Sequence, residues 1–222
     1  IQRICNAYGI RQSHIFSIAS CIIVTLETKD RQWITQTRRI LGYGTDMWKL
    51  DRLNDLSRRI CATQPSFEVI DREYEKILKG PTYSPAVQCA VYAMTAGAFA
   101  VFFGGNLWDG FAALFVGALI RVTLYAFAAI HMKAIFSNIL CSLISGIACI
   151  LVCYIGLGRH VEMIMIGNIM LLIPGVLMTN SFRDFISGDM ISGLLHFSEA
   201  MITAVCVAVG FIMSKMLLGG ML

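Results

Sequence analysis

Residues 81–222 contain very little charge. They hold five basic and five acidic side chains, whereas residues 1–80 hold 13 basic and 9 acidic ones. The whole chain is 57% hydrophobic and 14% charged, compared with roughly 25% charged residues in a soluble domain. These totals exclude an ordinary soluble protein. They predict a small polar domain over residues 1–81, followed by a transmembrane domain over residues 82–222.

The sequence also lacks the motifs of common catalytic and metal sites. It has no HExxH, no nucleophile elbow and no CxxC. Cys149 and Cys153 share a helix face, but small apolar packing explains them better than a metal does. We therefore expect no catalytic residue, no metal, no cofactor and no enzyme activity. The net charge of +4 forms no nucleic-acid-binding stripe and fits a cytoplasmic face near anionic lipid.

No signal peptide precedes the first helix, and the chain starts within a helical pattern, so we expect the true N-terminus to be missing. Residues 1–81 alternate between helix and strand signals and predict an α+β domain. The expected elements are a helix over residues 1–8 ended by Gly9, a strand over 14–28, a turn at Lys29-Asp30, a hairpin partner over 32–41, and two helices capped by Asp46 and Ser66.

The second domain contains five apolar segments long enough to cross a bilayer, which needs about 20 residues. Basic residues near the segment ends place the first domain on the cytoplasmic side of the cell (inner) membrane. An odd number of spans suggests a second membrane block of opposite orientation. The predicted all-α bundle has spans at residues 85–103, from 108 past 120, 135–157, 161–178 and 190–218.

Arg121 leaves two alternatives for the second span. If the span runs over residues 108–130, Arg121 lies near its middle, where a charge is costly and usually functional. If it ends near Ile120, Arg121 snorkels to the interface and residues 122–134 lie along the surface. We expect the second arrangement.

Five polar residues recur on the fifth predicted span at steps of three and four, which places them on one helix face. Such a face should lie against the bundle or a water path. Glu199 is a candidate proton-coupling group; alternatively, it pairs with His196 inside a packed bundle. The residues of this face are Asp189, Ser192, His196, Glu199 and Thr203.

The fourth predicted span is interrupted at Pro174-Gly175, where proline removes one helical hydrogen bond. We expect a kink or an unwound segment there, followed by an irregular polar loop. In that loop Arg183 could clamp a carboxylate; alternatively, it pairs with Asp184 or Asp189 as a simple loop cap. The candidate substrate-binding or translocation site comprises Asn168, Pro174, Gly175, Asn180, Arg183, Asp184, Asp189, His196 and Glu199, with Arg121, Ser192 and Thr203 as secondary members.

The segment IGNIMLLIPGVLMTNSFRDFISGDMISGL, residues 166–194, resembles the signature of the threonine/serine exporter family. WKLDRLNDLSRRI, residues 48–60, is similar to part of that family's N-terminal cytoplasmic domain. The resemblance implies export of small carboxylate metabolites, either threonine and serine or a dicarboxylate such as succinate, driven by ion or proton gradients.

Family members occur as one long chain or as two subunits, and this sequence resembles the larger subunit of the split form associated with succinate export. The resemblance thus implies a small membrane subunit as partner, in a multi-pass membrane protein surrounded by lipid; oligomerisation is left open. A competing interpretation is a non-transporting membrane scaffold or sensor, with residues 1–81 as its interaction domain.

Overall fold

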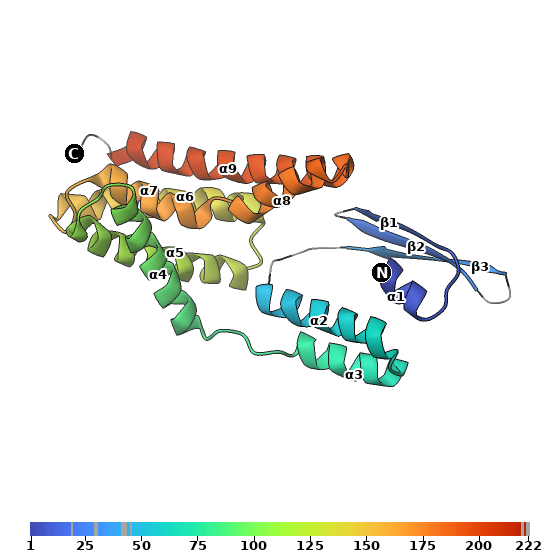
Figure 1. The fold of residues 1–222 in the computed structure, drawn as a ribbon. Coiled ribbons are helices and arrows are strands. Elements are labelled where there is room, and N and C mark those ends of the chain that lie inside the picture. The colour runs from blue at the N-terminus through green and yellow to red at the C-terminus, as the bar shows by residue number, and fades with distance from the viewer. Residues whose placement is uncertain (19, 29–30, 41–43, 45, 219, 221–222) are drawn as a thin grey trace. The chain divides into compact units, whose positions relative to one another are not determined.

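The computed structural model describes residues 1–18, 20–28, 31–40, 44, 46–218 and 220. Its contacts divide the chain into two compact units, Ile1–Thr82 and Tyr83–Leu222. Figure 1 colours the chain from blue at the N-terminus to red at the C-terminus. Each unit is described by itself.

The first unit begins with the short helix α1 (Gln2–Ala7), followed by a three-stranded antiparallel sheet of order β1-β2-β3. The predicted single strand over residues 14–28 is wrong, because it is two strands. These are β1 (Ser13–Ile18) and β2 (Cys21–Glu27). The hairpin partner is confirmed as β3 (Trp33–Arg39), although the predicted turn at residues 29–30 and the end at residue 41 lie outside the described residues.

Both faces of this sheet are mixed in character. The strand pairing places Ile15, Ile22, Val24, Leu26 and Ile34 on one face, together with serine, glutamine and arginine side chains. The other face combines Phe16, Ile18, Cys21, Ile23 and Trp33 with polar side chains. All seven residues of β3 are exposed.

Two helices, α2 (Met47–Thr63) and α3 (Phe67–Leu78), form the other part of this unit. The predicted cap at Asp46 is confirmed, because its carboxylate accepts a hydrogen bond from the main-chain N–H of Lys49 at 3.1 Å. Ser66 is the N-cap residue of α3, but its side chain makes no capping hydrogen bond. Leu56, Ile60 and Ile77 form the buried contact between the helices. Four apolar residues of these helices are exposed, because a two-helix layer buries only a narrow stripe: Leu50, Val69, Tyr74 and Leu78.

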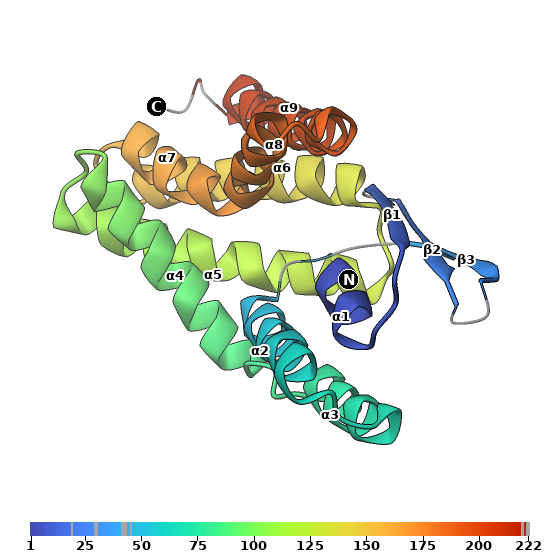
Figure 2. The same cartoon turned by 45° about the vertical axis from the view of Figure 1, so that its right-hand side comes forward.

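The second unit is entirely helical in its described part (Figures 1 and 2). Four of its helices are long and apolar enough to cross a membrane, and a bent pair, α7–α8, could supply a fifth span. The angle between α7 and α8 is 56°. The helices are α4 (Pro85–Phe102), α5 (Leu107–Ala129), α6 (Ala134–Tyr154), α7 (Val161–Leu172), α8 (Gly175–Ile186) and α9 (Met190–Leu218).

Small residues let the helices of this unit approach closely, as is usual where lipid supplies no hydrophobic drive for association. A Cβ built on Gly117 of α5 would lie 2.7 Å from the Cβ of Ala96 in α4. A Cβ on Gly210 of α9 would lie 2.6 Å from the carbonyl oxygen of Ile139 in α6. These two helix contacts therefore depend on glycine.

The expected end of the second span near Ile120 is wrong, because α5 continues without interruption to Ala129. Arg121 lies within this helix and donates a hydrogen bond to the side-chain oxygen of Gln88, near the start of α4. Its guanidinium also lies over the rings of Tyr92 and Tyr125, at 5.8 and 6.0 Å from their centroids. Arg121 is itself a good helix former, and leucine or alanine recurs after it at positions 124, 126, 128 and 129, which favours the continuation.

Candidate functional site

The break between α7 and α8 is confirmed at Pro174. Ile173 is extended, with ψ of 130°, and Pro174 has φ −78° and ψ 59°. The N–H of Gly175 donates to the carbonyl oxygen of Ile173 at 2.9 Å, which forms an inverse γ-turn. Proline cannot donate the helical hydrogen bond at this position, so the helix stops and restarts in a new direction.

The chain after the break is helical, so the prediction of an irregular loop is wrong. Asn180, Arg183 and Asp184 lie within α8, and its Met178 N–H donates to the carbonyl of Pro174 at 3.0 Å. Pro174 is tolerated because it precedes the first turn of α8, where its missing N–H has no partner to lose. Asp189 lies in the turn to α9, after Gly188 with φ +85°.

A hairpin of α8 against the first part of α9 brings two titratable residues together. Nδ1 of His196 lies 3.0 Å from Oδ2 of Asp184, and the two side chains are 22% and 18% exposed. The hydroxyl of Ser181 donates to the carbonyl of Gly193 at 2.9 Å and holds the two helices together. Both views show α8 beside this end of α9 (Figures 1 and 2).

The side chain of Arg183 is largely exposed, with 71% of its surface accessible. Its Nη2 lies 3.8 Å from Oδ1 of Asp184. The structure therefore contains the local Arg183–Asp184 contact that was one of the two alternatives. An exposed pair at this distance contributes little to stability.

The predicted polar face of α9 is shared between two neighbouring helices. Ser192 is buried and His196 mostly buried, on the side of the helix near α8. Glu199 and Thr203 instead line a groove of about 390 Å³ between α9 and the first turns of α6. Glu199 thus lies beside the start of α6 at Ala134.

Asn168 lies in a different place, within the helical core. Its side chain is fully buried in α7, and its Nδ2 donates to the carbonyl of Ile164 at 2.9 Å. Its Oδ1 has no hydrogen-bond partner in the described part of the chain. Its Nδ2 also lies 3.9 Å from Sγ of Cys149 in α6, so Asn168 faces the packed α6–α7 contact, whereas neighbouring Gly167 packs against the α4 backbone at Ala96.

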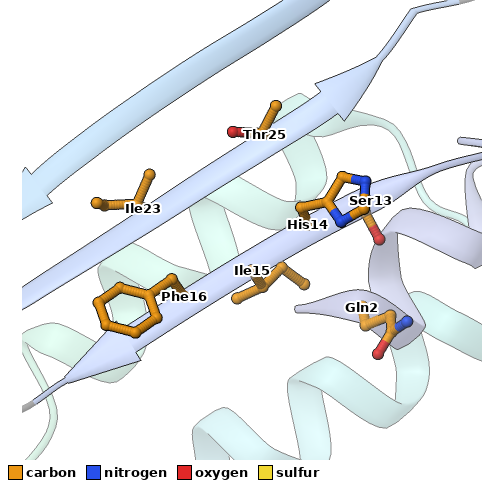
Figure 3. A pocket seen from close by; sticks show the side chains of 7 residues that line it. All are labelled: Gln2, Ser13, His14, Ile15, Phe16, Ile23 and Thr25. Carbon is orange, nitrogen blue, oxygen red and sulfur yellow. The ribbon is translucent and has the colours of Figure 1, made fainter.

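A second hollow lies on the sheet of the first unit. Figure 3 shows His14 and Phe16 of β1 with Ile23 and Thr25 of the neighbouring strand β2. The hollow has a volume of about 380 Å³. The ring of His14 stacks on that of Trp33, with 5.7 Å between their centroids.

Comparison with known proteins now adds to this geometry. The family model described as a threonine/serine exporter matches residues 1–218. The chain belongs to the threonine/serine exporter family. The threonine/serine exporter of Corynebacterium glutamicum is 24% identical over 210 residues, which cover 91% of this chain and 43% of that protein. This exporter-family chain therefore spans less than half the length of that relative. No solved structure matches it.

Together, the family and the apolar helices identify a multi-pass membrane protein of a transporter family. One cluster in this exporter-family chain was not predicted. Asp109 in the first turn of α5 is completely buried, and its carboxylate accepts main-chain hydrogen bonds from Asn106, Arg159 and His160 at 2.9, 2.6 and 2.9 Å.

Part of this cluster has a sequence signal. Asn106 and Asp109 stand three residues apart before an apolar run and form a capping box in the structure, as that spacing indicates. No local pattern connects Asp109 with Arg159 and His160, which lie about 50 positions later in the chain.

Proposed function

We propose that this protein exports small amino acids, threonine and serine, across the cell membrane. The observation that carries the proposal is the helix broken at Pro174 beside the polar residues of α8 and α9. Secondary transporters commonly build their substrate and ion sites at interrupted helices. The family membership supports the direction of transport and the class of substrate.

The path that we propose follows the α8–α9 hairpin and the groove between α9 and α6. Asp184, His196, Glu199 and Thr203 are polar side chains on these helices, whereas most neighbouring positions are apolar. Polar and charged residues within membrane helices usually line a substrate or ion route, since lipid cannot solvate them. Asn180 and Arg183 on α8 would contact the substrate as it enters or leaves.

The Asp184–His196 pair is our candidate for coupling export to a proton gradient. Histidine is the side chain that most often serves as a proton-sensitive switch, and this one lies 3.0 Å from a carboxylate. Arg183 at 3.8 Å is the other charge recorded next to Asp184. A proton gained or lost by this pair would change the attraction between α8 and α9 directly below the Pro174 break.

A second membrane half completes the transporter in this proposal. The C. glutamicum relative is more than twice as long as the matched region, and secondary transporters pair two blocks around a central site. We propose that a small membrane subunit supplies this half, and that the first unit faces the cytoplasm.

Efflux assays test the proposal. Cells producing this protein, with or without the product of a neighbouring gene that encodes a small membrane protein, are loaded with threonine, serine or succinate. The proposal expects threonine and serine to leave only when both proteins are present. If succinate alone leaves the cells, the substrate class is a dicarboxylate and not an amino acid. If the pair exports none of the three, a scaffold or sensor role is favoured.

A further inference from the structure

We propose that the groove between α6 and α9 binds the ammonium group of the transported amino acid, with the Glu199 carboxylate as its partner. This inference rests on the proposed function, since it assigns the site at which the same substrate is held. It gives Glu199 a substrate-binding role in place of the predicted proton-coupling role.

The size and position of the groove suit a small molecule. Its volume is about 390 Å³, which lies in the usual range for small-molecule sites. It lies beside the first turns of α6, at the helix end next to residues 130–133. With 29 residues, α9 is about 44 Å long, longer than the roughly 30 Å hydrocarbon core. A groove near one end of α6 can therefore be reached from water.

The charge in the groove selects for a cation. Among the described residues that line it, Glu199 is the one charged side chain. The Glu199 carboxylate makes no hydrogen bond or ion pair with any of the described residues. A lone carboxylate in a partly enclosed site attracts an ammonium group and repels a second carboxylate. A dicarboxylate such as succinate would meet like charge here.

The remaining lining matches the other parts of a hydroxy amino acid. Asn138, Ser198 and Thr203 offer neutral donors and acceptors for a carboxylate or a hydroxyl. Ile202 and Cys206 supply an apolar wall for a methyl group. Asp184 already pairs with His196, and Asp189 lies in the turn before α9 and does not line the groove. Glu199 is therefore the acid that remains for substrate.

Paired analogues of the substrate separate the two charges in a binding experiment. The complete encoded protein, in lipid nanodiscs together with any second half, is titrated with L-threonine, with 3-hydroxybutyrate, which lacks the ammonium group, and with threoninol, which lacks the carboxylate. We expect threonine and threoninol to bind, whereas 3-hydroxybutyrate and succinate compete poorly.

Variants of Glu199 test the assigned partner. Glu199→Gln should weaken threonine binding about tenfold or more, since it removes a charge-assisted contact. Glu199→Asp should retain most of the affinity. Glu162→Gln is the matched control, because Glu162 lies at the start of α7, where it is 69% exposed and 3.9 Å from Lys215. It should bind threonine as the unmodified protein does.

Cys206 gives a second measurement that needs no variant. It lines the groove, so bound threonine should slow its alkylation by N-ethylmaleimide, followed peptide by peptide in a mass spectrometer. Cys141, which is fully buried in α6, serves as the internal control. Succinate should leave the rate at Cys206 unchanged.

The possible failures of this proposal and of the proposed function can be distinguished. If the protein exports threonine while Glu199→Gln binds it with unchanged affinity, or if 3-hydroxybutyrate competes as well as threonine, the groove assignment is wrong and the export function stands. If the unmodified protein neither binds nor exports threonine, both are wrong.

Discussion

The carboxylate of Asp109 contacts His160 twice. Its Oδ1 accepts the main-chain N–H of His160 at 2.9 Å, and its Oδ2 lies 2.8 Å from the ring Nδ1. Asp109 stands in the first turn of α5, and His160 is the N-cap of α7. One buried acid therefore joins the start of α5 to the start of α7, at the opposite end of α7 from the Pro174 break.

Replacing Asp109 by alanine should destabilise the helical unit by about 3 kcal/mol, since it leaves the main-chain N–H groups of Asn106, Arg159 and His160 without their acceptor. Asp109→Asn, which keeps one acceptor oxygen, should cost less. The measurement is the thermal unfolding midpoint of the purified protein in detergent. Glu162→Gln is the control, and a midpoint for Asp109→Ala equal to that of the control would show that these hydrogen bonds add no stability.

Gly117→Leu should force α4 and α5 apart. Even a Cβ at this position meets Ala96 Cβ at 2.7 Å and the Tyr92 carbonyl at 2.8 Å, and overpacking costs about 1–3 kcal/mol or more. We expect a lower unfolding midpoint for Gly117→Ala and a larger loss for leucine. Phe115→Leu, on an exposed face of the same helix, should behave like the unmodified protein. Equal midpoints for all variants would contradict the close contact.

Pro174→Ala should allow a helical hydrogen bond across the break and bring α7 and α8 closer to one straight helix. If the break forms part of the transport path, threonine efflux should fall several-fold while the protein remains folded. The measurement is initial efflux rate per folded protein. Pro85→Ala is the matched control, because Pro85 occupies the first position of α4, where a proline costs little. Unchanged efflux in Pro174→Ala would remove the break from the mechanism.

His196→Gln should remove the response of efflux to an imposed proton gradient, since glutamine does not change charge with pH. Asp184→Asn should alter the same response by removing the partner at 3.0 Å. The measurement is threonine efflux from loaded cells or vesicles as the external pH is varied between about 5 and 8. Asp189→Asn, which changes an exposed acid in the turn before α9, tests whether any nearby charge has this effect. A pH profile shared by all four proteins would exclude the pair from coupling.

Several elements could be predicted from local patterns. The Asp46 cap, the hairpin of β2 and β3, and the break at Pro174 are each confirmed. They depend on a few neighbouring residues: a capping carboxylate, strand-forming side chains and a proline without an N–H. Such effects act over one or two turns and need no knowledge of distant contacts.

The two wrongly predicted element boundaries share one physical origin. The strand over residues 14–28 is divided into β1 and β2, and α5 continues past Ile120 as far as Ala129. Strand-forming residues occur on both sides of the first turn, and Arg121 is a good helix former despite its charge. Composition therefore could not locate either boundary.

The sequence by itself determined the apolar helices, the interruption at Pro174 and the spacing of polar residues along α9. Only the tertiary structure decided which helix each polar residue meets: His196 faces Asp184 of α8, whereas Glu199 lines a groove with α6. It also showed that the buried Asp109 joins segments about 50 residues apart. The physical reason is that spacing along a helix sets the direction of a side chain, while packing between helices determines what lies there.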